Sequence, residues 1–300
     1  MVTEFRSTHQ ELQRDIESMC QWLESLGIGI EQNRVADYRK TFATIAEHIQ
    51  NGTVSELENS IDFPKQADNF HDASELVLIH QQLSGYDSPA FKQTLAKAVN
   101  GPTSLAAERP QSGDARNRVF ELVMAAQFRA AGIPVKFVDP ADAIITVDNI
   151  KCFVECKRIQ SEKAVEDRVR QASSQIRDRL DQQASAKPRG LIAIDISKTV
   201  NPDGTLYFDA PSKDSLVEWV DARLAVFLSR NRTILTSQLD PRVCGVLLYL
   251  RTPAVVADEE LTNYRRLFPV PTPGNDELNK RVYDKLVNQL WRTAPKHIFK

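Results

Sequence analysis

The chain reads Asp142-Ala-Ile-Ile-Thr-Val147, then Asp148-Asn149, then Ile150-Lys-Cys-Phe-Val-Glu155-Cys-Lys157. Two short apolar runs therefore flank a polar dipeptide, and each run carries charge. Asp and Asn tolerate positive φ better than most residues, so the dipeptide predicts a tight hairpin turn. Charged groups inside apolar strands are costly unless they are paired or used. The stretch predicts a covered hairpin whose charges have partners or a function.

A two-residue turn sets the register of such a hairpin. It pairs Val147 with Ile150 and Ala143 with Val154, and one step further it places Asp142 opposite Glu155. Opposite residues have Cβ atoms roughly 4.5–5.5 Å apart, and two carboxylates at that range repel each other. A divalent cation between them would reverse the penalty, and oxygen ligands suit Mg²⁺, Mn²⁺ or Ca²⁺.

Lys157 follows Glu155 by two residues, so both side chains point to the same face of the strand. A longer turn would substitute Asp139 for Asp142. The alternative is a hairpin with edge charges only, in which Asp142 caps a strand end and Glu155 pairs with Lys157 or Arg158.

Hydrophobic periodicity around the hairpin predicts the order α-β-β-β-α-β-α-β. The expected elements are a helix at 115–131, a strand at 135–139, the hairpin, a helix at 162–184, a strand at 191–196, a helix at 212–229 and a strand at 243–250. Phe268-Pro-Val-Pro-Thr-Pro-Gly274 favours an extended, loop-like segment, and 275–292 favours a terminal helix. The fold class is α/β, with a central mixed sheet flanked by helices.

The residues before about Asn100 favour helices throughout, so the core is expected to follow an all-α N-terminal region. The apolar spacing indicates helices near 4–26, 32–50, 73–83 and 89–99. Turn residues between Asn100 and Asp114 mark a linker. We therefore expect a helical accessory domain at 1–105 and the α/β domain at 106–300. The accessory domain is expected to pack on the core, to form a homodimer or to hold a partner protein.

The hairpin residues resemble the signature of the PD-(D/E)XK nuclease superfamily, which places an Asp on one strand and Glu-x-Lys on the next. The matching residues are Asp142 and Glu155-Cys156-Lys157. The resemblance covers roughly residues 112–250 and implies a restriction-endonuclease-like core. One departure is that the family's Pro-Asp dipeptide appears here as Pro140-Ala141-Asp142.

The resemblance implies a metal-dependent nuclease, an endonuclease or exonuclease acting on DNA rather than RNA. Asp142 and Glu155 would hold Mg²⁺, or Mn²⁺, with the Cys156 carbonyl as a further ligand. Lys157 would orient the attacking water or stabilise the developing oxyanion. The alternatives are a nuclease acting on RNA and a non-catalytic nucleic-acid-binding or assembly protein that keeps the fold.

Three further groups of polar residues are candidates for a place at or near this site. Glu121 is either a third acidic group near the metal or a partner for Arg118 one turn earlier. The resemblance also implies a Gln on the helix at 162–184, and Gln175 and Gln171 are the candidates. The arginines of that helix, interleaved with acidic residues, favour a solvated, ion-paired surface; they are Arg168, Arg170, Arg177 and Arg179.

Composition narrows the possible partners. The 300 residues are 42% hydrophobic and 26% charged, with a formal net charge of -2 and a pI near 6.3. No overall basic field draws the chain to nucleic acid, so any DNA-binding surface is a local patch. Four scattered cysteines predict buried thiols of a cytoplasmic protein. The five histidines avoid the hairpin, and no segment is expected to enter a membrane.

Overall fold

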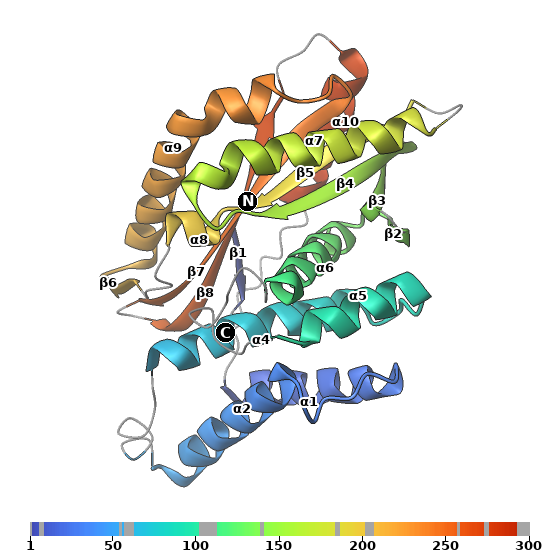
Figure 1. Cartoon of the computed structure of the whole chain (residues 1–300). Coiled ribbons are helices and arrows are strands. Elements are labelled where there is room, and N and C mark those ends of the chain that lie inside the picture. The colour runs from blue at the N-terminus through green and yellow to red at the C-terminus, as the bar shows by residue number, and fades with distance from the viewer. Residues whose placement is uncertain are drawn as a thin grey trace.

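The computed structural model describes residues 2–5, 9–53, 56, 63–101, 113–138, 141–183, 187–201, 207–256, 259–272 and 276–292. Within them, one mixed eight-stranded sheet runs in the order β1-β8-β7-β5-β4-β3-β2, with β6 paired to β7 beside this path. The strands are β1 (Val2–Phe5), β2 (Val135–Val138), β3 (Ala141–Val147), β4 (Ile150–Arg158), β5 (Arg189–Asp195), β6 (Tyr207–Ala210), β7 (Val243–Val256) and β8 (Glu259–Pro271). The predicted mixed sheet flanked by helices is confirmed (Figure 1).

Helices cover both faces of the sheet. They are α1 (His9–Ser25), α2 (Arg34–Asn51), α4 (Phe63–Leu83), α5 (Pro89–Val99), α6 (Asp114–Ala130), α7 (Val165–Asp181), α8 (Ser197–Val200), α9 (Lys213–Ser237) and α10 (Glu277–Arg292), with a short 3-10 helix at Glu162–Ala164. Helices α6 and α10 contact one face, and α7 and α9 contact the other. Successive strand residues alternate between the two cores because side chains of a strand point to opposite faces. Leu191 and Ala193 thus lie in one core, and Ile192 and Ile194 in the other.

The hairpin between β3 and β4 has the predicted register. Asp148 and Asn149 both have positive φ, 50° and 62°, as a tight two-residue turn requires. The pairs are Val147 with Ile150, Ile145 with Cys152 and Ala143 with Val154. Strand β4 then runs parallel to β5, and β5 parallel to β7. Local turn chemistry was therefore sufficient to predict the register of the hairpin between β3 and β4.

Two expectations are corrected at the far edge of the sheet. The N-terminal region is not entirely helical, since β1 pairs antiparallel with β8, joining Val2 to Arg266 and Phe5 to Asn263. From Phe268 to Pro271 the proline-rich stretch is not a loop but the end of β8, paired to β7, and Pro273 and Gly274 lie outside the described residues. Strand β1 pairs with β8 only from Asn263 to Arg266, so among the described strands the proline-bearing end of β8 has a partner on one side alone, and prolines are tolerated there.

The N-terminal helices form further layers below α6. Figure 1 shows α4 and α5 beneath α6, with α1 and α2 on their far side. One continuous hydrophobic core holds Phe91 of α5, Leu76 of α4, Phe120 of α6 and Tyr249 of β7. The helical region therefore packs on the α/β core. The boundary predicted near 105 lies outside the described residues and stays a prediction.

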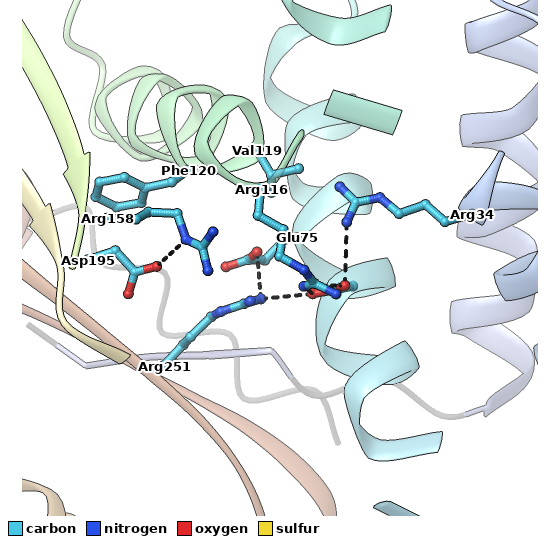
Figure 2. A pocket seen from close by; sticks show the side chains of 9 residues that line it. Arg34, Glu75, Arg116, Val119, Phe120, Arg158, Asp195 and Arg251 are labelled. Carbon is cyan, nitrogen blue, oxygen red and sulfur yellow. Dashed lines mark hydrogen bonds and ion pairs between the residues drawn. The ribbon is translucent and has the colours of Figure 1, made fainter. Parts of the chain in front are cut away.

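A group of buried charges also joins these layers, and we call it the Asp72 cluster. Its members are Arg34 of α2, Asp72 and Glu75 of α4, Arg116 of α6, and Tyr249 and Arg251 of β7. Figure 2 shows how side chains from α2, α4, α6 and the sheet converge, with Arg158 and Asp195 paired beside them. Buried polar groups of this kind tie separate elements to one arrangement.

None of the helices in the described part of the chain has the length and apolar character needed to cross a membrane.

Candidate active site

The site is built at the end of the hairpin where β3 begins and β4 ends. The carboxylate of Asp142 accepts a hydrogen bond from the backbone N–H of Cys156, with 2.8 Å between Oδ2 and N. That N–H belongs to the peptide linking Glu155 to Cys156, so Asp142 lies beside the Glu-x-Lys segment, as predicted. Asp139, the alternative to Asp142, lies outside the described residues.

Glu155 is buried, with its side chain 1% exposed, and both of its oxygens have cationic partners. The Lys157 ammonium lies 2.9 Å from Oε2, and the Arg179 guanidinium forms an ion pair with Oε1. The edge-charge alternative predicted the contact with Lys157, and it is present. Its other suggestion is wrong, because Arg158 pairs with Asp195 at 3.2 Å.

Arg179 is the site residue that the sequence analysis missed. It was grouped with the solvated arginines of α7, and Arg168, Arg170 and Arg177 are indeed exposed. Arg179 is buried instead. The overlooked signal was helical spacing: the buried residues of α7 include Val165, Val169, Ala172 and Ile176, and Arg179 continues their stripe.

Close packing of α7 on the sheet brings Arg179 to Glu155. Gly190 of β5 lies under the helix, and a Cβ added there would overlap the side chain of Ile176. Any larger residue at 190 would push α7 outward. The absence of a side chain therefore lets a helix residue reach a carboxylate on the neighbouring strand β4.

Glu121 faces the site from α6 and makes a two-pronged contact with Arg118, at 3.0 Å to Oε1 and 2.9 Å to Oε2. The pKa of Glu121 is raised to about 7, first by burial and then by the negative charge of Asp142, while Arg118 and Lys157 lower it. Glu121 is therefore a partner of Arg118, as one alternative predicted. It also lies close enough to Asp142 for that charge to raise its pKa, which agrees with the other alternative, a third acidic group near the site.

The two glutamines of α7 differ. Gln171 is exposed and accepts a hydrogen bond from Arg168 at 3.0 Å. Gln175 is half-buried, and its carbonyl oxygen is shielded from solvent without a hydrogen-bond partner in the described part of the chain. Gln175 lies one helical turn before Arg179, so it is the glutamine on the side of the site.

The Cys156 side chain is buried on the opposite face from Glu155, and burial raises the pKa of its thiol well above the usual value. A neutral thiol in that core position packs as a small apolar group. The charges of Asp142 and Glu121 raise the pKa of this thiol further, and the backbone N–H of Cys156 donates to Asp142.

The donor atoms at the site suit a hard cation. Asp142, Glu155 and Glu121 supply carboxylate oxygens, and the charge of Asp142 adds to burial in raising the pKa of Glu121, a contribution that a cation would offset. The side chains of the described residues do not, however, bring three or more His, Cys, Asp or Glu groups around one metal position. Arg118 pairs with Glu121, and both Lys157 and Arg179 pair with Glu155. Metal binding at this site requires Glu155 to exchange a partner.

Comparison of the chain with protein-family models, with curated proteins and with solved structures found no match.

Proposed function

We propose that this protein is a metal-dependent nuclease that hydrolyses phosphodiester bonds in DNA, with Mg²⁺ or Mn²⁺ as its cation. The observation that carries the proposal is the hydrogen bond from Cys156 N–H to Asp142. It joins the Asp of β3 to the Glu-x-Lys segment of β4 in the register that the resemblance to PD-(D/E)XK nucleases implies.

The order of elements around the hairpin supports the same proposal. Helix α6 precedes three antiparallel strands, β2, β3 and β4, and α7 then leads to β5, parallel to β4. A restriction-endonuclease-like core is expected to have such a mixed sheet with helices on both faces. A shared fold does not imply a shared function, so the chemistry of the site has to support the activity.

The roles follow from what each side chain offers. Asp142 and Glu155 would hold the cation, with Glu121 and the Cys156 carbonyl as further oxygen ligands. A bound Mg²⁺ would supply a water of lowered pKa and positive charge beside the scissile phosphate. Lys157, held at Glu155, places an ammonium where negative charge develops on the phosphate oxygens. The free carbonyl oxygen of Gln175 is suited to accept a hydrogen bond from water.

One observation favours a second candidate function. Glu155 is buried and forms ion pairs with both Arg179 and Lys157. A carboxylate that only stabilises the fold would have the same arrangement. On this alternative the protein is a non-catalytic nucleic-acid-binding or assembly protein that retains the fold. Its N-terminal helical layers would then be the surface for a partner or a second copy.

The test is cleavage of labelled DNA and RNA, single- and double-stranded, with Mg²⁺, Mn²⁺ or EDTA. We expect metal-dependent cleavage that falls about 10²–10³-fold in Lys157→Ala, with metal binding retained. Asp142→Ala should lose both cleavage and metal binding. Lys151→Ala is the matched control, because Lys151 is an exposed lysine of the same strand. This variant should cleave as well as the parent.

Two results would overturn the proposal. Cleavage by Lys157→Ala equal to the parent would remove the catalytic assignment. No cleavage of any substrate, together with no Mn²⁺ binding that depends on Asp142, would favour the non-catalytic alternative.

A further inference from the structure

The ion pair between Arg179 and Glu155 is the starting point, because it joins two nearly sealed groups from different elements. The side chain of Arg179 is 9% exposed and that of Glu155 is 1% exposed. Charges this far from solvent are weakly screened, so the contact is stronger than a pair on the surface. It fills the carboxylate oxygen that Lys157 leaves open.

A cation approaching Glu155 meets two positive charges already bound there. A carboxylate has lone pairs for more than two partners, but Arg179 and Lys157 together repel a divalent ion that binds beside them. Lys157 is tied to Glu155 by the strand itself, two residues along β4. Arg179 comes from α7, a separate element on which Gln175 offers it another acceptor, so we take it as the partner that withdraws.

The structure holds a second position for the withdrawn guanidinium. Gln175 lies four residues before Arg179, and residues at that spacing are neighbours on one face of a helix. Its carbonyl oxygen is buried and lacks a hydrogen-bond partner among the described residues. An unpaired buried acceptor of this kind is costly, and a guanidinium released from Glu155 would satisfy it.

We propose that Arg179 is a positioning residue that keeps Glu155 in a closed, guanidinium-bound form and competes with the divalent cation for that carboxylate, moving to the Gln175 carbonyl when the cation binds. The inference rests on the proposed function for the existence of a cation site. By competing for Glu155, Arg179 lowers the affinity of the site for the divalent cation, so a higher metal concentration is needed to fill it.

The test measures Mn²⁺ binding to the whole chain without nucleic acid, by isothermal titration calorimetry and by the electron paramagnetic resonance signal of free Mn²⁺. Arg179→Met removes the competing charge at similar length. We expect it to bind Mn²⁺ about 5–150-fold more tightly than the parent, the usual range for coupled sites. Arg179→Lys keeps the charge and should return the affinity toward that of the parent.

Arg177→Met is the matched control. It makes the same change two residues away on α7, where the side chain is 56% exposed and does not face Glu155. Its Mn²⁺ affinity should equal that of the parent. Arg179→Gln, neutral but able to hydrogen-bond with Glu155, is the second variant if Arg179→Met does not fold, and it too should bind more tightly.

The outcomes separate this inference from the proposed function. In one outcome, the parent protein binds Mn²⁺ through Asp142 while the neutral Arg179 variants bind it equally or more weakly. This outcome overturns the proposed competition by Arg179 and leaves the nuclease proposal standing. A chain that binds no Mn²⁺ in any folded variant overturns both. Tighter binding in Arg179→Met that is abolished by adding Asp142→Asn supports both.

Discussion

The Asp72 cluster and the candidate active site are both built from buried carboxylates and arginines, yet they are completed to different degrees. Asp72 accepts from Arg116 at 2.7 Å, from Arg251 at 3.2 Å and from the Tyr38 hydroxyl at 3.0 Å. At the candidate active site, by contrast, Gln175 keeps a buried oxygen without a hydrogen-bond partner in the part of the chain that the structure describes. Both oxygens of Asp72 thus have donors, although Nε of Arg34 lacks a hydrogen-bond partner among the described residues, whereas the unpaired group at the candidate site is an acceptor.

The pKa values of the acids record the same difference. Burial alone would raise the pKa of Asp72, but the charges of Arg116, Arg251 and Arg34 outweigh it and hold the value well below the usual range. The pKa of Glu121 is raised to about 7 by burial and by Asp142. A network that serves the fold stabilises its charges, while a site left with unbalanced charge retains the capacity to bind or transfer something.

The largest effect is expected from Asp72→Asn. It removes the carboxylate that three buried arginines share and leaves Arg251 with Glu75 as its acid, and breaking a buried ion pair from one side costs about 3–5 kcal/mol. Urea unfolding at pH 7 measures the loss. Asp178→Asn, an exposed acid on α7 with a 3.7 Å contact to Arg177, is the control and should change stability by less than about 1 kcal/mol. Equal losses of stability in the two variants would show that the Asp72 cluster does not stabilise the packing of the helical layers on the sheet.

The next effect is the pH dependence of Glu121→Gln. Because the folded-state pKa of Glu121 is raised, its protonated form favours the folded state, and the parent loses stability as pH rises from the unfolded pKa toward about 7. The variant lacks this loss. Its free energy of unfolding relative to the parent should improve by up to about 1.4 kcal/mol for each pH unit in that window. Urea titrations at pH 5, 6, 7 and 8 check it; a difference that is constant with pH contradicts the raised pKa.

A smaller effect is expected from Tyr249→Phe, which removes the hydroxyl that donates to Glu75 at 2.8 Å. Glu75 keeps Arg251 at 2.7 Å, so its charge stays compensated. The loss should be about 1–3 kcal/mol, the cost of a buried acceptor deprived of a donor. A double-mutant cycle with Glu75→Gln isolates the pair, and a coupling energy near zero would exclude Tyr249 from the Asp72 cluster.

The smallest effect is expected at an exposed pair of the same chemistry. Arg230 of α9 lies 3.2 Å from Glu162, with side chains 63% and 45% exposed. Arg230→Ala should lower stability by less than about 1 kcal/mol, since solvent and salt screen such pairs. Thermal melts in low and high salt measure it. A loss as large as that of Asp72→Asn would mean that burial is not what separates these ion pairs.

Local sequence was enough to predict the hairpin and the residues it joins. The turn at Asp148-Asn149 and the alternation of β3 and β4 depend on neighbours a few positions apart. From them follow the register and the approach of Asp142 to the Glu155 segment. The helices around the core follow from apolar spacing in the same way, because a helix face is also a local property.

The contacts that were missed all join residues far apart in the chain. Nothing near Arg179 indicates that its helix packs closely over Gly190 and faces Glu155. Nothing near Val2 indicates that it pairs with Arg266. The proline-rich end of β8 suggested a loop because its tolerance for proline depends on its place at the edge of the sheet.

The amino-acid sequence by itself therefore determined the α/β class, the hairpin and its acidic-acidic-basic residues, because turn chemistry and periodicity act over a few residues. Only the tertiary structure decided which of those charges are already compensated. The charge state of a buried group depends on every element packed against it: Glu155 takes its second partner from α7, Glu121 is affected by Asp142 of β3, and Asp72 gathers arginines from α2, α6 and β7.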